Sequence, residues 1–242
     1  MTQRLLLGML TPSSNTVLEP VTTAMLAGLP EASAHFGRFK VTEIALTQEA
    51  LGQFDDREIL GAAEMLSHAK VNVIGWSGTA ASWRGFETDE QLCRRITAAT
   101  GIPACTSVLA LNELFERLGV RRVGLVTPYL DDVQARIVAH YAAAGVECVA
   151  ERHLGLRDNF SFSDVDAHTL CRLVREVAAS QPDAIVILCT NLRGGPLVAE
   201  LEAELGIPIL DSVAAVVWKS LQLAGADTRR VRGWGRLFEL SE

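Results

Sequence analysis

A cysteine that directly follows a short apolar run is the residue of this chain best placed to do chemistry. The run covers residues 184–188, and Cys189, Thr190 and Asn191 follow it. Such a run is typical of a buried strand in a parallel sheet, and open α/β sheets bind ligands beyond the carboxyl ends of their strands. A thiol with a reference pKa of about 8.5 can donate or accept a proton at a carbon centre there. The alternative is a thiol with a structural role only, since free cysteine is among the most buried residue types.

Three further segments place hydroxyl, amide and backbone donors at the ends of predicted strands. The residues concerned are Pro12, Ser13 and Asn15 in the first segment, Gly78, Thr79 and Ala80 in the second, and Tyr129 in the third. Free backbone N–H groups gather where a helix begins, and glycine lets the backbone come close to a ligand. Neutral donors of this kind suit a carboxylate, or a dianion derived from one, such as an enediolate. We therefore expect these segments, together with the Cys189 segment, to bind a small mono- or dicarboxylate.

Alternating strands and helices must position these segments. Strands are expected where apolar residues run together, at residues 5–10, 41–46, 71–76, 123–126, 146–150 and 184–188. Helices are expected at residues 16–27, 57–69, 88–99, 107–118, 131–143, 164–179, 196–205 and 213–223. We expect Ser107 and Asp164 to act as N-caps, and Gly101, Gly119 and Gly145 to end the helices that precede them. This alternation predicts an α/β fold with parallel sheets and helices on their faces.

An internal repeat divides the chain into two similar parts. Three pairs of segments match in the same order: residues 8–12 with 124–128, 78–79 with 189–190, and 101–103 with 206–208. The alternative, convergent chemistry of βα turns, explains any one match better than it explains all three in order. We therefore predict two pseudosymmetric halves, one made of residues 1–107 and 213–242 and the other of residues 108–212. The active site is expected in the cleft between them.

The repeat also predicts an asymmetry in this cleft, because the position equivalent to Cys189 is Gly78. Two thiols on opposite walls would take a proton from one face of a carbon atom and return it on the other, which is racemisation. A single thiol favours a one-sided reaction in which a carbanion arises by another route and is protonated from the Cys189 side. Loss of CO₂ from a malonate-type substrate forms such a carbanion without a second base.

The composition argues against several kinds of partner. The chain of 242 residues carries a net charge of −7, which is unfavourable for binding to nucleic acid or to an anionic membrane. No apolar run approaches the ~20 residues of a membrane span.

The five cysteines form no CxxC pair and the five histidines form no HxH or HExxH pattern, so we expect no metal site. Unpaired cysteines fit a reducing compartment and predict a cytoplasmic protein. Trp218 and Trp234 suit either the interface of a homo-oligomer or the core.

Several motifs resemble one known family over essentially the whole chain. Residues 78–79 with 82–85, 118–123 with 129–133, and 233–238 are similar to segments of arylmalonate decarboxylases. Residues 12–16 and 158–160 are instead similar to segments of maleate cis-trans isomerases. The chain thus resembles the branch of the aspartate/glutamate racemase superfamily that contains both enzymes. The resemblance implies two pseudosymmetric flavodoxin-like halves and no cofactor or metal.

The resemblance also implies roles for individual residues. In the decarboxylases a single cysteine, which matches Cys189, protonates an enediolate, and the dioxyanion hole corresponds to Thr79, Tyr129 and the backbone of the Cys189 loop. In the isomerases two cysteines act, and asparagines that match Asn15 and Asn159 hold carboxylates. These matches make Cys189, Thr79 and Tyr129 the expected catalytic residues. The expected substrate-binding residues are Pro12, Ser13, Asn15, Gly78, Ala80, Asn159, Thr190 and Asn191.

The chain departs from both groups in the predicted cleft. Gly78 stands where the isomerases carry their first cysteine, Ala80 where the decarboxylases carry a serine, and Thr190-Asn191 where the decarboxylases carry a glycine pair. The primary hypothesis is a cofactor-independent decarboxylase of a substituted malonate or a similar small diacid. Two alternatives stay open: a cis-trans isomerase or racemase of a small dicarboxylate, and a carboxylate-binding protein without turnover. Relatives of this type also occur in ectoine degradation.

Overall fold

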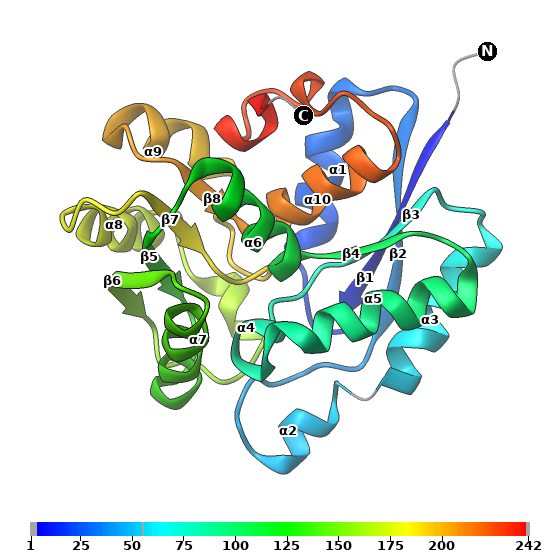
Figure 1. Cartoon of the computed structure of the whole chain (residues 1–242), viewed down its shortest axis with the longest axis horizontal. Helices are drawn as coiled ribbons and strands as arrows, with labels where there is room; N and C mark the ends of the chain where they lie inside the picture. The colour runs from blue at the N-terminus through cyan, green and yellow to red at the C-terminus, as the bar shows by residue number, and fades with distance from the viewer. Residues whose placement is uncertain (1–3, 55, 241–242) are drawn as a thin grey trace.

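Two four-stranded parallel sheets form the centre of the protein (Figure 1). The computed structural model describes residues 4–54 and 56–240. The first sheet has the order β2-β1-β3-β4 and comprises β1 (Leu5–Pro12), β2 (Ala32–Phe39), β3 (Val73–Trp76) and β4 (Ala104–Thr106). The second has the order β6-β5-β7-β8 and comprises β5 (Arg122–Thr127), β6 (Glu147–His153), β7 (Ala184–Ile187) and β8 (Ile209–Asp211). The prediction of an α/β fold with parallel sheets is confirmed.

Helices connect the strands and cover the sheets. In the first part of the chain they are α1 (Leu18–Met25), α2 (Gln48–Gly52), α3 (Asp56–His68), α4 (Ala81–Arg84) and α5 (Phe86–Thr100). In the rest they are α6 (Ser107–Leu118), α7 (Asp131–Ala143), α8 (Ala167–Ala178), α9 (Val198–Leu205) and α10 (Ser212–Leu223). Short 3₁₀ segments follow at η1 (Leu26–Gly28), η2 (Phe160–Asp164), η3 (Gly195–Leu197), η4 (Thr228–Arg230) and η5 (Arg236–Glu239). Within the described part of the chain, no helix is long and apolar enough to span a bilayer.

The two sheets are equivalent residue by residue at the strand ends that carry the predicted site. Trp76 at the end of β3 is paired with Leu10, and Ile187 at the end of β7 is paired with Val126. Beyond each pair the next residue of the inner strand donates a backbone hydrogen bond to the first strand of its sheet. The two bonds are 3.1 and 2.9 Å long. The residue after that is Gly78 in the first half and Cys189 in the second, as the repeat predicts.

The expected strand at 41–46 is wrong, because the second strand of the first sheet is β2 at Ala32–Phe39. Most of β2 is only half-buried at a sheet edge, so its sequence lacks the continuous apolar run that marks a central strand. Val41, Ile44 and Ala45 are buried in a loop instead. The strands β4 and β8 and the helices α2 and α4 are too short to give a periodic signal.

The expected helix caps are corrected in two places and confirmed in others. The N-caps are Thr106 for α6 and Asp166 for α8, where the sequence predicted Ser107 and Asp164; each side chain accepts a hydrogen bond from the backbone of the first turn. Gly101 and Gly119 end α5 and α6 in the left-handed conformation that the C-terminal stop requires.

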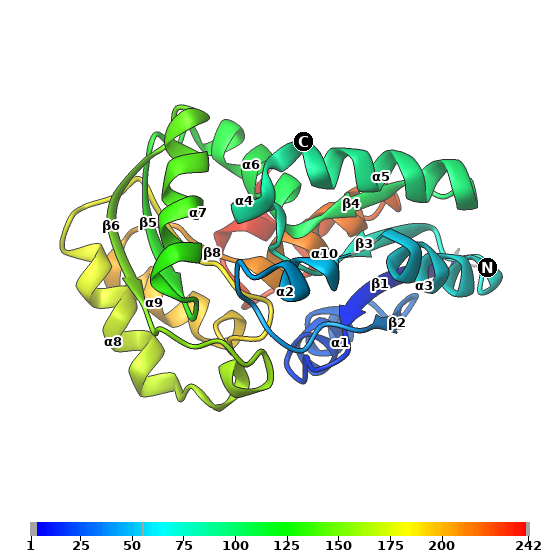
Figure 2. The ribbon, with the colours of Figure 1, turned by 90° about the horizontal axis from the view of Figure 1, so that it is seen from below.

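The two sheets lie side by side, with α6 and α10 between them and α2 at their junction (Figure 2). The helices α6 and α10 pack against each other, and α10 also packs against β3 and β4. Trp218 of α10 is fully buried under Arg117 and Lys219, which accounts for this tryptophan by packing within the chain. The division of the chain at residues 107 and 212 stays a prediction.

Burial of Asp89 in the first turn of α5 gives the fold a testable pH dependence. The side chain is 3% exposed and one carboxylate oxygen has no hydrogen-bond partner. Burial raises the pKa of Asp89 to about 7, although a hydrogen bond from Thr106 opposes the shift. Because the folded protein holds this proton more tightly than the unfolded chain does, the stabilisation is complete below about pH 4 and is lost as the pH rises through about 7.

We therefore expect Asp89→Asn to flatten the pH dependence of stability between pH 4 and 8. At pH 8 the variant should be more stable than the native chain by on the order of 2 kcal/mol, because no buried charge has to be accommodated. Urea unfolding at several pH values measures this difference. The exposed neighbour Glu90 provides the control, Glu90→Gln, which should leave the pH profile unchanged. A profile as steep in Asp89→Asn as in the native chain would contradict the assignment.

Candidate active site

A small pocket opens where the strand ends of the two sheets meet. Its walls are formed by Pro12, Val41, Ile44, Phe54, Trp76, Gly78, Thr79, Ala80, Trp83, Tyr129, Asn159, Cys189 and Thr190, and its cavity volume is about 20 Å³. Eight of these residues are among those predicted from the sequence. Three further predicted residues, Ser13, Asn15 and Asn191, do not line the pocket. Each is hydrogen-bonded to a residue that does, namely Val41, Thr190 and Asn159 in turn. The pocket therefore brings together Cys189 and Gly78, from equivalent positions of the two sheets.

Two related hydrogen bonds join the halves at this pocket. Thr79, after β3, is bonded through its hydroxyl to the hydroxyl of Tyr129, after β5, at 2.7 Å. Thr190, after β7, accepts a hydrogen bond of 3.1 Å from the side-chain amide of Asn15, after β1. Thr79 and Thr190 occupy equivalent positions in the two sheets, so each half contributes a threonine that binds the first loop of the other half.

The Thr79–Tyr129 pair retains a donor for a ligand. Two hydroxyl groups carry two hydrogens, and the bond between them uses one. The second hydrogen is available to an oxygen in the pocket or to the Cys189 sulfur, with which Tyr129 also interacts. Thr190 differs, because its hydroxyl accepts from Asn15 and donates to the Ser77 carbonyl oxygen at 3.2 Å. The free donor capacity therefore lies on the Tyr129 side of the pocket.

The remaining predicted amides and hydroxyls hold the loops in place. The side chain of Asn191 donates to the Asn159 carbonyl oxygen and accepts from the Thr16 backbone N–H, so both of its ends are bound to backbone. The Asn15 side-chain oxygen accepts from the backbone at the start of α1. The Asn159 amide donates to Ser14 at 2.7 Å, and Ser13 exchanges hydrogen bonds with the backbone of Val41.

Burial keeps the pocket's thiol protonated. Cys189 is 3% exposed, and its burial raises the pKa of the thiol to about 11. Hydrogen bonds from the Asn191 and Leu192 backbones and from Tyr129 oppose this shift. The pKa of Tyr129 is itself raised well above its ordinary value by burial and by the nearby Cys189. At neutral pH both groups are therefore neutral, and Cys189 carries a proton that it can donate.

The sequence did not identify the apolar wall of the pocket. Val41, Ile44 and Phe54 come from the segment between β2 and α3, and Trp76 and Trp83 come from β3 and α4. Trp83 packs edge-on against Tyr129, with ring centroids 5.0 Å apart, and Phe54 packs edge-on against Trp83 at 6.3 Å. The only signal for these residues was the position of the two tryptophans on either side of the Gly78-Thr79 motif.

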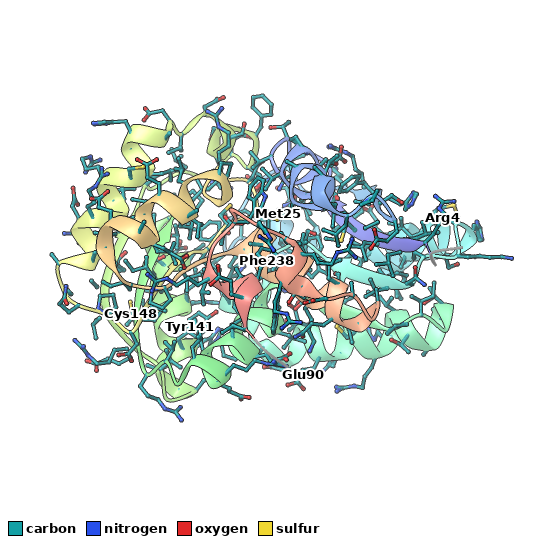
Figure 3. The ribbon with its side chains drawn as sticks, turned by 90° about the horizontal axis from the view of Figure 1, so that it is seen from above. Arg4, Met25, Glu90, Tyr141, Cys148 and Phe238 are labelled. Atoms are coloured by element: carbon teal, nitrogen blue, oxygen red, sulfur yellow. The ribbon has the colours of Figure 1, made fainter. Side chains whose placement is uncertain are left out.

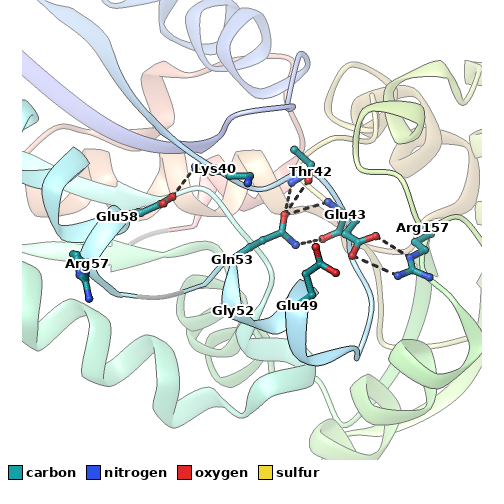
Figure 4. A pocket seen from close by; sticks show the side chains of 9 residues that line it. All are labelled: Lys40, Thr42, Glu43, Glu49, Gly52, Gln53, Arg57, Glu58 and Arg157. Atoms are coloured by element: carbon teal, nitrogen blue, oxygen red, sulfur yellow. Dashed lines mark hydrogen bonds and ion pairs between the residues drawn. The ribbon is translucent and has the colours of Figure 1, made fainter.

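Residues 40–54 close the pocket from one side. Val41, Ile44 and Phe54 face inward, whereas Lys40, Thr42, Glu43 and Gln53 line a charged hollow on the outer surface (Figure 4). The segment is attached to the second half by three contacts. Glu43 forms an ion pair with Arg157 at 2.9 Å, the Ile44 N–H donates to the Arg157 carbonyl oxygen, and the Asn159 N–H donates to that of Thr42.

The other thiols lie apart from this pocket. Cys148, for example, lies on β6 at the outer edge of the second half (Figure 3). All five cysteines are free. Among residues 4–54 and 56–240 no three His, Cys, Asp or Glu side chains are grouped to hold a metal ion.

Comparison with known proteins places this geometry in a family. Residues 8–238 match the family model for arylmalonate decarboxylase. The arylmalonate decarboxylase of Bordetella bronchiseptica is 34% identical over 186 residues, which are 76% of this chain and 78% of that protein. The crystal structure of the maleate isomerase Iso from Pseudomonas putida S16 has a TM-score of 0.89 at 26% identity and covers 98% of both chains.

A mutant of the Nocardia farcinica maleate cis-trans isomerase, solved with a covalently bound succinylcysteine intermediate, has a TM-score of 0.87 at 26% identity and covers 98% of this chain and 99% of that one. The relatives thus include both decarboxylases and isomerases of the Asp/Glu racemase-like superfamily, as the sequence motifs indicated. The chain belongs to the arylmalonate decarboxylase family.

Proposed function

We propose that this protein is a cofactor-independent decarboxylase of a substituted malonate or a similar small diacid. The observation that carries the proposal is the asymmetry of the pocket. Cys189 is the single cysteine among the described residues that line it, and the equivalent position in the other sheet is Gly78. A site with one protonated thiol suits a reaction that needs one proton donor and no second base.

The reaction begins with cleavage of the bond between the α-carbon and one carboxylate. CO₂ leaves, and the electron pair of that bond passes into the remaining carboxylate, which becomes an enediolate. The spare hydrogen of the Thr79–Tyr129 pair is a donor suited to the developing charge. The Asn191 N–H donates to the Cys189 sulfur instead. The Cys189 thiol then gives its proton to the α-carbon, and the resulting thiolate recovers a proton from water.

The pocket has one polar wall and one apolar wall, which favours a diacid substrate with an apolar substituent. Hydroxyl and backbone donors stand on one wall, and Ile44, Phe54 and Trp83 stand on another. An apolar wall excludes water, which strengthens hydrogen bonds to the enediolate and favours departure of neutral CO₂.

A second candidate function is isomerisation or racemisation of a small dicarboxylate. The isomerase structures favour it by their similarity over the whole chain, and Asn159 lines the pocket while Asn15 is bonded to Thr190 beside it. In this case Ser77, Thr79 or a water would have to take the role of the second thiol. A third candidate is a carboxylate-binding protein that lacks turnover. Free thiols favour the cytoplasm for all three, and a homo-oligomer stays a prediction.

Incubation with a panel of malonates, maleate and amino acids in deuterated buffer, followed by NMR, distinguishes the three. We expect CO₂ release from a substituted malonate and one deuterium at the α-carbon of the product. Fumarate from maleate, or exchange without CO₂ release, would establish the second candidate. Binding shifts without turnover would establish the third.

Cys189→Ala should abolish turnover of the accepted substrate while the melting temperature stays near that of the native chain, because the change removes the proton donor and only one buried atom. The matched control is Cys105→Ala, which removes a buried thiol bonded to Ser220 outside the pocket. It should retain turnover. Full activity in Cys189→Ala would rule out the thiol as the donor.

Tyr129→Phe should lower kcat by roughly 10²–10³-fold, the usual cost of removing one donor to a developing oxyanion. KM should change much less if the bond strengthens only as charge develops. Tyr141→Phe is the control, because the Tyr141 hydroxyl is equally buried but has no hydrogen-bond partner. Steady-state kinetics on both variants test the assignment, and equal losses in the two would refute it.

A further inference from the structure

Gly78 has no space for a side chain, and the reason is Trp76. A Cβ atom built on Gly78 would lie 2.0 Å from Cζ2 of the Trp76 ring and 2.4 Å from its Cε2. Carbon atoms that are not bonded pack at about 3.5–4.0 Å. The indole therefore occupies the space that any side chain at position 78 would need.

The Trp76 ring cannot easily move away from this position. It is 2% exposed, and its backbone is paired with Leu10 on one side and Thr106 on the other. On its other flank it packs against Phe39, with ring centroids 5.0 Å apart. Because two strands fix the Trp76 backbone and Phe39 packs against its buried ring, we treat the exclusion at Gly78 as a fixed property of this wall.

In the second half, the side chain equivalent to Trp76 packs against a different glycine. Ile187 is the residue of β7 equivalent to Trp76. Its side chain lies against Gly194, where a built Cβ would come within 2.8 Å of it. Ile187 thus packs against Gly194, which follows the Cys189 loop, and Cys189 can carry a side chain. The pair Trp76 and Gly78 in one half therefore corresponds to the pair Ile187 and Cys189 in the other.

We propose that Trp76 is the specificity-determining residue that makes the reaction one-sided. Both Trp76 and Cys189 line the pocket, and the indole fills the place from which a second donor would face the thiol. The α-carbon of the intermediate then has the Cys189 thiol on one face and an aromatic ring on the other. Because the ring carries no proton for transfer to carbon and excludes water, the product forms as one enantiomer. This inference rests on the proposed decarboxylation.

The first test is the stereochemistry of the product in Trp76→Ala. Decarboxylation of a prochiral α-substituted malonate in deuterated buffer should give one enantiomer with the native chain. Trp76→Ala opens the opposite face to solvent, so the enantiomeric excess should fall by at least half, whereas Trp76→Phe should retain most of it. The control is Trp83→Ala, which removes another buried pocket tryptophan that is not among the nearest neighbours of a Cβ on Gly78. It should change KM or kcat but not the enantiomeric excess. Unchanged stereochemistry in Trp76→Ala would overturn the proposal.

A second test does not depend on turnover. Gly78→Cys should lower the melting temperature by several degrees in the native background, because the new side chain collides with the ring. In the Trp76→Ala background the same change should cost little, and the introduced thiol should react with a maleimide reagent, quantified by mass spectrometry of the labelled peptide. Bound phenylmalonate should protect it.

Together the two tests distinguish failure of the proposed decarboxylation from failure of the proposed role of Trp76. If no malonate is decarboxylated but the effects of the two substitutions on the melting temperature are strongly non-additive and phenylmalonate protects the introduced thiol, the proposed reaction fails and the role of Trp76 in shaping the pocket stands. If the effects are additive, or if the ligand leaves the introduced thiol unprotected, the Trp76 proposal fails whatever the reaction is.

Discussion

The hydrogen bond between Thr79 and Tyr129, with its counterpart between Asn15 and Thr190, is the contact on which the site depends. Each bond joins a loop of one half to a loop of the other, and all four side chains are almost completely buried. A buried hydroxyl or amide that loses its partner costs about 1–3 kcal/mol, so the two halves are held in one relative position at the pocket. The thiol and the oxyanion donors come from different strand ends, and this constraint fixes the distance between them.

The pseudosymmetry is maintained in the groups that position the loops and broken at the position of the Cys189 thiol, the proposed proton donor. The two threonines, the prolines Pro12 and Pro128 and the register of the inner strand against the first strand are the same in both halves. The second position after each inner strand is instead a glycine in one half and a cysteine in the other. A repeated scaffold can therefore support a one-sided reaction, because the scaffold and the reacting groups occupy separate positions.

The sequence predicted the part of the site that follows from local pattern. Cys189, Thr79 and Tyr129 each follow a buried strand that its apolar run identifies, and the repeat places Gly78 opposite Cys189. The apolar wall could not be predicted in this way. Val41, Ile44 and Phe54 belong to a loop whose burial depends on contacts with the second half, through Glu43 and Arg157. The exclusion at Gly78 depends on the orientation of one ring, which no spacing reveals.

Residues 40–54 cover the pocket, and the burial of Cys189 affects both the loss and the recovery of its proton. In the proposed reaction, the raised pKa of Cys189 keeps its proton in place until a carbanion, which is a far stronger base, forms beside it. After the transfer the same burial makes the thiolate unfavourable, and only Tyr129 and the backbone of Asn191 and Leu192 offset this cost. Water must reach the sulfur to restore the thiol, and the product must leave by the same opening. The segment that covers the pocket is attached to the second half by the Glu43–Arg157 ion pair and by two backbone hydrogen bonds.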